Sequence, residues 1–295
     1  MKLMCIHAHF DDFEFVAAGT FDRIIGQNSG GAQTKLVVCT DGAVGHHFRS
    51  LEETRAMRWK EQQSASQIGG HEVERLRLPD GTLRREANPV VDRAFVAALW
   101  KTIRAFEPDY LFCPPLAQDP LAGVHMDHIA VAEAVRNVAY MINVPHAYID
   151  FYPSPDVESM PCKVPVILNT YDAYMAGANP YDFVVNVEAA FETICEMAWC
   201  HQSQIREWLP WVGRHQMSVP ESFEEWKQVM RERFDRQNQE LGLPAGIAAE
   251  PFMVTSWGEV PTTDRLLADF PGIMAEFSNM ENLNRRLATL GLGAS

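Results

Sequence analysis

The chain lacks the sequence features of several protein classes. It has no G-x-G-x-x-G turn, no C-x-x-C pair and no apolar run of the roughly 18 residues that a membrane-spanning helix needs. Its 25 lysines and arginines face 39 aspartates and glutamates, so we expect no nucleic-acid partner and no membrane surface. The amino terminus also lacks the pattern of a secretory signal, and we therefore expect a cytoplasmic protein.

The 6 cysteines are not arranged as a disulfide framework or a structural zinc knot. Cys5, Cys39 and Cys113 lie inside apolar runs, where a thiol behaves as a small hydrophobic group. Cys195 and Cys200 share one predicted helix. This usage indicates a reducing compartment, in agreement with the expected location.

Segments that resemble strands and helices alternate through the first half of the chain. We predict strands at 2–8, 34–40, 73–78, 110–115 and 146–152, and helices at 14–25, 51–68, 89–106 and 127–142. This alternation predicts a Rossmann-like α/β fold, in which a mostly parallel sheet has helices on both faces. With 295 residues, 47% of them hydrophobic, the chain can bury a large core.

The alternation weakens after residue 152. Residues 169–187 are polar and interrupted and could form a rim over a site, while helices are expected at 187–209 and 222–242. Four tryptophans in and between these helices favour a core or subunit contact over a substrate platform: Trp199, Trp208, Trp211 and Trp226. We predict an α/β domain at 1–210 and a helical C-terminal extension at 211–295 that packs on the same domain.

Two short clusters carry the residues that a metal site needs. His9-Phe10-Asp11-Asp12 follows the first predicted strand, and His125-Met126-Asp127-His128 opens a helix after another strand. A catalytic zinc takes about three nitrogen or oxygen ligands from the protein and leaves a position for water. The carboxyl ends of parallel strands meet at one edge of a sheet, where ligands bind. His9, Asp12 and His128 are therefore the predicted ligands.

Each cluster alone has a simpler interpretation. A single histidine at a strand end is more often a structural residue, and an Asp-Asp pair is more often a solvated turn or helix cap. Two histidines at a spacing of three on a helix commonly face solvent. The conjunction of both clusters at one predicted sheet edge favours the metal site.

The segments AHFDDFEFVAAGT and GVHMDH resemble motifs of the PIG-L or LmbE-like family of zinc-dependent N-deacetylases. LVVCTDGAVG, LPDG and HQSQ agree in order and approximate spacing, so that the similarity runs from about residue 2 to about residue 204, with a fainter echo at 249–258. Phe10 stands where the family usually has proline, and Phe13 where it usually has an acidic residue. These departures bear on metal affinity and substrate more than on reaction type.

The resemblance implies a role for each site residue. One Zn²⁺ per chain would be bound, with Fe²⁺ as the alternative metal. Asp11 would be the general base, His125 would polarise the scissile carbonyl, and Asp127 would orient that imidazole. Either Asp11 or His125 would protonate the leaving amine. The expected substrate-binding residues are Arg58, Asp80 and His201, for which structural roles remain open alternatives.

The resemblance thus implies a zinc-dependent amidase that removes an acyl group, with acetyl expected, from an amino sugar or a related small molecule. A hydrolase of non-sugar N-acyl amines is the nearest alternative. A nucleotide-binding Rossmann protein and a non-catalytic metal-binding homologue are further alternatives. The first lacks its glycine-rich turn, and the second has no use for Asp11. Family members often form oligomers, which leaves a homo-oligomer open.

Overall fold

The structure is a computed structural model that describes residues 1–27, 31–153, 162–213 and 217–289. Within these residues the centre of the molecule is a 7-stranded sheet of order β3-β2-β1-β4-β5-β7-β6. Its strands are β1 (Lys2–His7), β2 (Gln33–Val38), β3 (Glu72–Arg75), β4 (Tyr110–Cys113), β5 (Val166–Asn169), β6 (Phe183–Asn186) and β7 (Ala249–Val254). The pairs among β1 to β5 are parallel, and β7 is antiparallel to β5 and β6.

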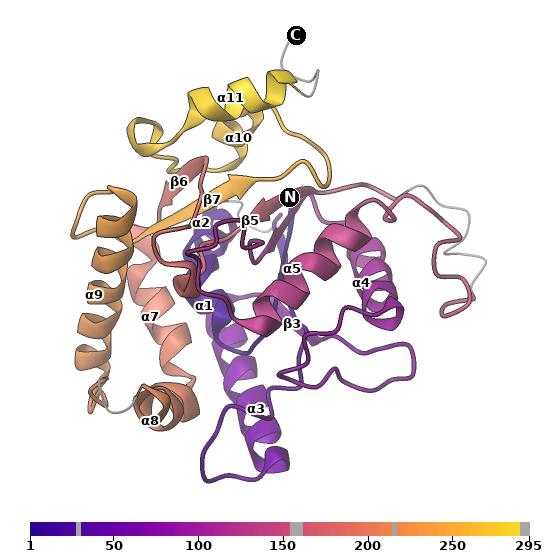
Figure 1. Ribbon diagram of the computed structural model, residues 1–295. Coiled ribbons are helices and arrows are strands. Elements are labelled where there is room, and N and C mark those ends of the chain that lie inside the picture. The colour runs from indigo at the N-terminus through magenta and orange to yellow at the C-terminus, as the bar shows by residue number, and fades with distance from the viewer. Residues whose placement is uncertain (28–30, 154–161, 214–216, 290–295) are drawn as a thin grey trace.

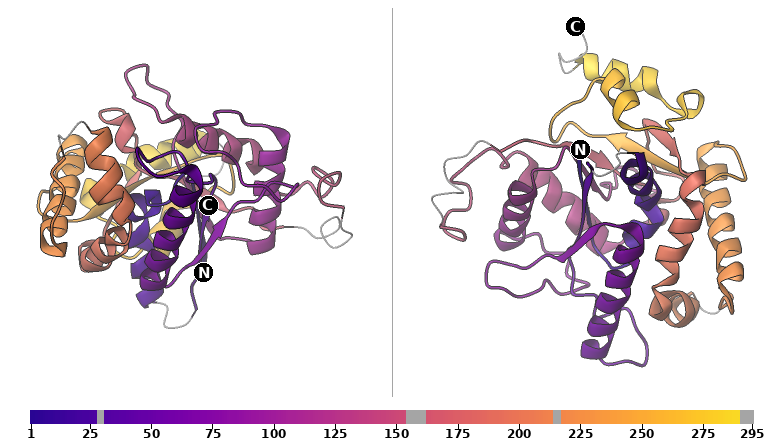
Figure 2. Two further views of the ribbon diagram at one scale, coloured as in Figure 1. Left: turned by 90° about the horizontal axis from the view of Figure 1, so that it is seen from below. Right: turned by 180° about the vertical axis from the view of Figure 1, so that it is seen from behind.

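Helices cover both faces of this sheet. Figure 1 shows α4 and α5 on one side and α1, α2 and α7 on the other, and the rear view in Figure 2 agrees. The bounds are α1 (Asp12–Val16), α2 (Ala18–Gln27), α3 (Leu51–Gly69), α4 (Arg93–Phe106), α5 (Met126–Ala139), α7 (Phe191–Trp199), α8 (Leu209–Val212), α9 (Phe223–Leu241), α10 (Thr263–Asp269) and α11 (Met280–Thr289). The predicted α/β fold with a mostly parallel sheet is thereby confirmed.

The alternation of side chains along β1 explains why both faces are buried. Leu3 and Cys5 belong to the core that α1, α2 and α7 cover, whereas Met4 and Ile6 belong to the core beneath α4 and α5. All four side chains are fully buried. A central parallel strand is covered on both sides and therefore reads as a continuous apolar run.

The strand order places the two predicted clusters side by side. From β1 the chain moves outward through β2 to β3 and then returns to β4 on the other side of β1. The strand order therefore reverses between β1 and β4, which is where open α/β sheets bind ligands at the carboxyl ends of their strands. The loop after β1 contains His9 to Asp11 and leads to Asp12 at the start of α1, and the loop after β4 leads to His125 and α5.

One predicted strand is wrong, and three observed strands, β5, β6 and β7, were not predicted. Residues 146–152 form turns, in which the amides of Phe151 and Tyr152 donate to the carbonyl of Tyr148. The partner of β4 is instead β5, whose residues are all buried. A central position needs an unbroken apolar run, whereas Asp150 in the predicted segment pairs with Arg93 at the surface. β6 lies inside the region expected to be a polar rim.

The C-terminal part of the chain contributes to the central sheet. β7 lies between β5 and β6, so residues 249–254 complete the same sheet as the N-terminal strands. α9 begins after the cap residue Ser222 and ends at Gly242, and it packs against α7. No helix in the described part of the chain is both long and apolar enough to cross a lipid bilayer.

Candidate metal centre and active site

The loop between β1 and α1 has a strained backbone at its functional position. Asp11 adopts φ 92°, a left-handed conformation that is uncommon for a residue with a side chain, and it is the cap residue of α1. Such strain persists where the surroundings impose it, and it clusters at functional sites. The side chains of Arg58 and Gln62 from α3 bond to this loop, since Arg58 donates to the Phe10 carbonyl at 2.6 Å and Gln62 accepts from the Asp11 amide at 3.2 Å.

The two phenylalanines that depart from the family pattern both lie in the core. Phe10 is fully buried against Gly42, where a Cβ atom would lie 2.4 Å from its ring and where φ is +62°. The absence of a side chain at Gly42 therefore makes room for the ring. Phe13 packs edge-on against His71 and Phe21. Packing of Phe10 thus fixes the loop that proline would otherwise stiffen.

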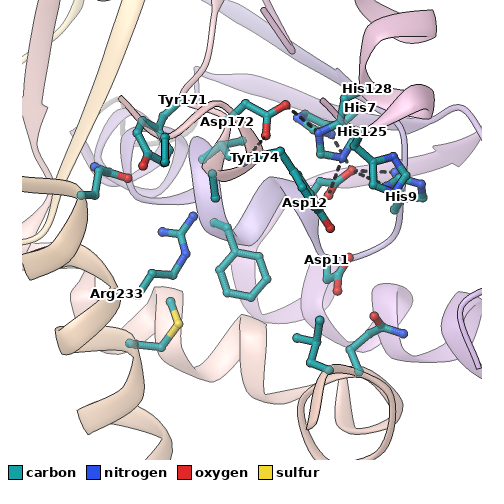
Figure 3. Close-up of a pocket in the computed structure, with 18 of the residues that line it drawn as sticks. His7, His9, Asp11, Asp12, His125, His128, Tyr171, Asp172, Tyr174 and Arg233 are labelled. Atoms are coloured by element: carbon teal, nitrogen blue, oxygen red, sulfur yellow. Dashed lines mark hydrogen bonds and ion pairs between the residues drawn. The ribbon is translucent and has the colours of Figure 1, made fainter. Parts of the chain in front are cut away.

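The structure brings the three predicted ligands together. Nδ1 of His9 lies 3.2 Å from Oδ2 of Asp12, and Nε2 of His128 lies 3.4 Å from Oδ1 of the same carboxylate. The two contacts use different oxygens of Asp12, so the carboxylate lies between the two imidazoles (Figure 3). The groups spaced closely enough to hold one ion are His9 with His125 and His128, and His7 with Asp12 and His128.

Each histidine of this group has a carboxylate on its other ring nitrogen. Nε2 of His9 lies 3.3 Å from Oδ2 of Asp127, and Nδ1 of His128 lies 2.9 Å from Oδ2 of Asp172. Histidines that bind metals usually donate their second N–H in this way, which fixes the ring and raises its basicity. The family resemblance implies that Asp127 orients His125, but the Asp127 carboxylate lies against His9 instead. Asp172 was not predicted.

The charges of the group favour a cation at its centre. Burial alone would raise the pKa of Asp12, but the neighbouring imidazoles of His7, His128 and His9 outweigh it and hold this pKa well below its usual range. Burial lowers the pKa of both His9 and His128, yet the Asp12 carboxylate outweighs it and raises these values to about 10 and about 9. Protons on these imidazoles balance the buried carboxylates, and a divalent ion can take over that role. The residues present therefore fit a metal.

His7 is a further member of the group that the sequence analysis missed. It is the last residue of β1, and its Nδ1 lies 2.5 Å from Oδ2 of Asp12. Its ring meets that of His128 edge-on at 4.8 Å. His7 and His9 are two positions apart at the end of a strand, so a period of two places them on the same face. Two sets of possible ligands therefore share His128: His9 with His125, and His7 with Asp12.

Asp11 faces the same cavity but belongs to neither set of possible ligands. Burial raises the pKa of its carboxyl to about 6, while the Arg58 guanidinium, 3.2 Å away, opposes this rise. A carboxyl with a pKa near neutrality can both take up and release a proton under working conditions. Asp11 and Asp12 are adjacent in sequence, yet their surroundings raise the pKa of Asp11 and lower the pKa of Asp12.

His125 is the cap residue of α5, and its Nδ1 accepts a hydrogen bond of 3.3 Å from the amide of Asp127. Burial, followed by the nearby charge of His9 and His128, lowers the pKa of His125 to about 4. The ring is therefore neutral at pH 7 with its proton on Nε2. It lies 4.6 Å from the ring of His9 and 5.1 Å from that of Tyr174, in the cavity wall.

The metal-binding group forms one end of a cavity of about 520 Å³. The segment after β5 contributes Tyr171, Asp172 and Tyr174, so part of the expected polar rim does line the site. Further apolar lining comes from Phe15, Val16, Trp208, Trp226, Val229 and Met230. A cavity of this size and lining is typical of a small-molecule site.

The predicted substrate residues lie in different places. Arg58 lines the cavity, but its guanidinium is buried and holds the loop after β1. Asp80 is exposed in a turn, where it accepts from the amide and hydroxyl of Thr82. His201 is fully buried beside Glu14, with 3.3 Å between Nε2 and the carboxylate. Neither Asp80 nor His201 is part of the cavity wall.

The tryptophans divide between core and cavity. Trp226 is buried and donates from its indole N–H to the Cys195 carbonyl at 3.1 Å, while one of its edges lines the cavity. Trp208 also lines the cavity and stacks on Trp211, which is exposed. Trp226 therefore has the expected core role, but it also lines the cavity, which the sequence did not indicate.

The fold and the grouped side chains define an α/β protein with a candidate metal centre at the carboxyl edge of its parallel sheet. Residues 4–139 match the family model described as PIG-L: GlcNAc-PI de-N-acetylase. This segment contains both clusters on which the resemblance was based, and it confirms that resemblance. The similarity to the PIG-L family model thus extends over residues 4–139. None of the curated proteins compared with the chain matches it.

Solved structures share the fold at low sequence identity. N,N′-diacetylchitobiose deacetylase from Pyrococcus horikoshii, in complex with an inhibitor, has a TM-score of 0.63 and 20% identity, and the match covers 90% of this chain and 88% of that one. A 4-carboxy-2-hydroxymuconate hydratase from Pseudomonas putida has a TM-score of 0.58 and 15% identity, and the match covers 86% of this chain and 95% of that one. A conserved protein from Thermus thermophilus has a TM-score of 0.58 and 22% identity, and the match covers 88% of this chain and 96% of that one. Because these names include a deacetylase and a hydratase, the fold alone does not decide the reaction.

Proposed function

We propose that this protein is a metal-dependent amidase, an N-deacetylase that uses zinc to hydrolyse the amide bond of a small N-acetylated amine. The observation that carries the proposal is the contrast between neighbouring aspartates. Asp12 lies among three imidazoles, whereas Asp11 stays outside the possible ligand sets with a pKa of about 6. A hydrolase of this kind needs one carboxylate to hold the metal and another to accept a proton. The family description supports the same reaction.

His9, Asp12 and His128 would hold the ion. A bound zinc ion supplies Lewis acidity and lowers the pKa of water at the site toward roughly 7. His7 bonds to the Asp12 carboxylate, and Asp127 and Asp172 bond to the outer nitrogens of His9 and His128. Fe²⁺ accepts the same nitrogen and oxygen ligands, so it remains the alternative metal.

Asp11 would act as the general base. Its carboxylate accepts a proton from the attacking water, and the new C–O bond forms as the carbonyl becomes tetrahedral. Neutral His125, whose proton is on Nε2, donates a hydrogen bond to the oxygen on which negative charge develops. Asp11 then returns its proton to the leaving nitrogen, and the C–N bond breaks to give acetate and an amine. Arg58 steadies Asp11 through its 3.2 Å contact.

The other functions considered from the sequence find less support. A nucleotide phosphate would approach the loop after β1, but Asp11 and Asp12 occupy this loop and would repel it. A non-catalytic metal-binding protein has no need for a second carboxylate with a strained backbone beside the ligands. The amino-sugar part of the hypothesis remains a prediction.

Release of primary amine from a panel of N-acetyl sugars and N-acetyl aromatic amines tests the proposal. We expect the zinc-loaded protein to hydrolyse members of the panel and Asp11→Asn to lose about 10²- to 10⁴-fold of that rate, since a general base contributes about this factor. Asp264→Asn is the control, because this exposed aspartate in the first turn of α10 lies outside the cavity. Full activity in Asp11→Asn would refute the assigned role. Absence of amine release from the whole panel would count against the deacetylase.

A further inference from the structure

Arg233 lies in the cavity wall that α9 provides. This helix presents Trp226, Val229, Met230, Arg233 and Gln237 to the cavity, at the spacing of one helical face. Figure 3 shows Arg233 at the opposite end of the drawn group from His9 and His128, with Tyr174 between them. The helix thus places a cationic group in the cavity, remote from the candidate metal centre.

The guanidinium of Arg233 has no anionic partner among the described residues. Its Nη1 is buried and makes no hydrogen bond, and its contacts are the rings of Phe15 at 4.8 Å and Phe234 at 6.0 Å. Arg231 on the same helix is different, since both of its terminal nitrogens bond to Glu188 at 2.7 and 2.8 Å. Arg233 is partly exposed as a whole, but a buried guanidinium nitrogen without a partner is costly, so this side chain is poised to receive an anion.

The carboxylates near Arg233 are already engaged elsewhere. Glu240 accepts the Tyr171 hydroxyl at 2.7 Å and the Gly177 amide at 2.8 Å. Glu250 accepts two amides and a hydroxyl from the start of α2 at 2.6–2.9 Å. Neither carboxylate forms an ion pair with Arg233, although the charge of Glu250 is near enough to raise the pKa of Arg233. Burial nevertheless lowers the pKa of Arg233 to about 10, and the guanidinium still carries its charge at neutral pH.

The wall shared by the two ends of the cavity is largely apolar. Phe15, Val16, Val229 and Met230 contribute hydrocarbon or aromatic surface. A polyhydroxylated sugar would leave many of its hydroxyl groups without partners against such surface, whereas an aromatic or aliphatic body would be well accommodated. The cavity thus has acidic groups at the candidate metal-binding end and apolar surface along this wall, while α9 contributes Arg233 and Arg236 together with Glu240.

We propose that Arg233 binds a carboxylate of the substrate, so that the preferred substrates are N-acetylated amines in which an aromatic or aliphatic body separates the amide from an acid group. This inference rests on the proposed deacetylase function and identifies its substrate class. The guanidinium fork matches a carboxylate and can form two parallel hydrogen bonds with it.

Matched pairs of small molecules test this proposal. The probes are 4-acetamidobenzoate, 4-acetamidophenylacetate and 3-(4-acetamidophenyl)propanoate, whose acid groups lie at increasing distances from the ring. Each acid is compared with its own primary carboxamide, which removes the charge and keeps the rest of the molecule. Binding is measured calorimetrically with zinc-loaded Asp11→Asn protein, and hydrolysis is measured with the parent. We expect at least one acid to bind about ten- to a hundredfold more tightly than its amide, as for a charge-assisted hydrogen bond.

Variants of α9 identify the group responsible. Arg233→Gln should reduce the acid-to-amide ratio to about one, mainly through KM in the hydrolysis assay. Lys227→Gln removes the same charge from the same helix but lies outside the cavity, where it pairs with Glu192 and Glu224, and it should keep the ratio. An equal ratio in the parent, failure of every acid to bind, or an acid preference that survives in Arg233→Gln would overturn the proposal.

The two proposals can fail separately. Acid binding that depends on Arg233 without any amine release would support the anion site and count against the deacetylase. Amine release from acids and amides alike, unchanged in Arg233→Gln, would support the deacetylase and remove the anion site.

Discussion

Asp172 lies 2.9 Å from Nδ1 of His128, although the two residues come from separate segments that follow neighbouring strands of the sheet. Asp172 also accepts the amide of Tyr174, and its own amide donates to Asn179. These hydrogen bonds position the Asp172 carboxylate independently of its contact with His128. His128 of the candidate metal centre is thus oriented by the segment after β5 as well as by its own helix.

We expect Asp172→Asn to weaken zinc binding by about 10- to 100-fold, which is the usual effect of losing the carboxylate behind a metal-binding histidine. Competition with a chromophoric chelator measures this affinity. Asp80→Asn, in an exposed turn, is the matched control and should bind zinc as the parent does. Equal affinities for the parent and Asp172→Asn would show that this contact does not tune the site.

Variants of His7 distinguish a positioning role from direct coordination. Asparagine places an amide N–H near the position of Nδ1, so His7→Asn should keep the bond to Asp12 and most of the zinc affinity. His7→Leu removes that bond, and we expect it to weaken zinc binding by about tenfold or more. If the asparagine variant lost as much affinity as the leucine variant, His7 would be acting as a ligand.

The pair formed by Glu188 and Arg231 predicts how stability depends on pH. Partial burial raises the pKa of Glu188, but hydrogen bonds from Arg231 and from the amide of Ala248 outweigh it and hold the pKa below its ordinary value. A lowered folded-state pKa means that the contribution is fully present above the unfolded pKa of about 4.3 and is lost as the pH falls through the folded value.

The variant Glu188→Gln should therefore be less stable than the parent near pH 7, and the difference should shrink below about pH 4. Urea unfolding at a series of pH values measures it. Glu232→Gln, whose pair with Arg236 is exposed and 3.9 Å long, should show no such trend. A difference between parent and Glu188→Gln that stayed constant down to about pH 2 would contradict the assignment. Because α9 carries Arg231 as well as Arg233, this pair also positions the cavity wall.

Sequence patterns predicted the grouping of His9, Asp12 and His128 because each cluster lies on the carboxyl side of a buried strand. His9 and Asp12 come after β1, and His128 comes after β4, so the sheet alone brings them to one edge. Asp172 could not be predicted in the same way, because the strand before it was assigned to residues 146–152 instead of β5. His7 could have been predicted, because it lies two positions before His9 at the end of a strand, a spacing that places both side chains on the same face.

The remainder of the cavity depends on packing that local patterns do not contain. Arg233 belongs to a charged helix in which an arginine is ordinarily solvated, and nothing in its spacing shows that this one lies in the cavity wall. Asp80 and His201 were assigned through family resemblance, and the structure places them in a surface turn and in the core. Tertiary contacts decide these positions.

Zinc content per chain in Asp11→Asn and Asp12→Asn, purified in parallel and dialysed against the same zinc buffer, tests the central claim most directly. The substitutions are identical and adjacent, so general effects on folding or charge are closely matched. The account predicts about one zinc per chain in Asp11→Asn and a large loss in Asp12→Asn, because one carboxylate binds the ion and the other accepts the proton. Equal zinc content in the two variants, or loss in Asp11→Asn alone, would contradict it.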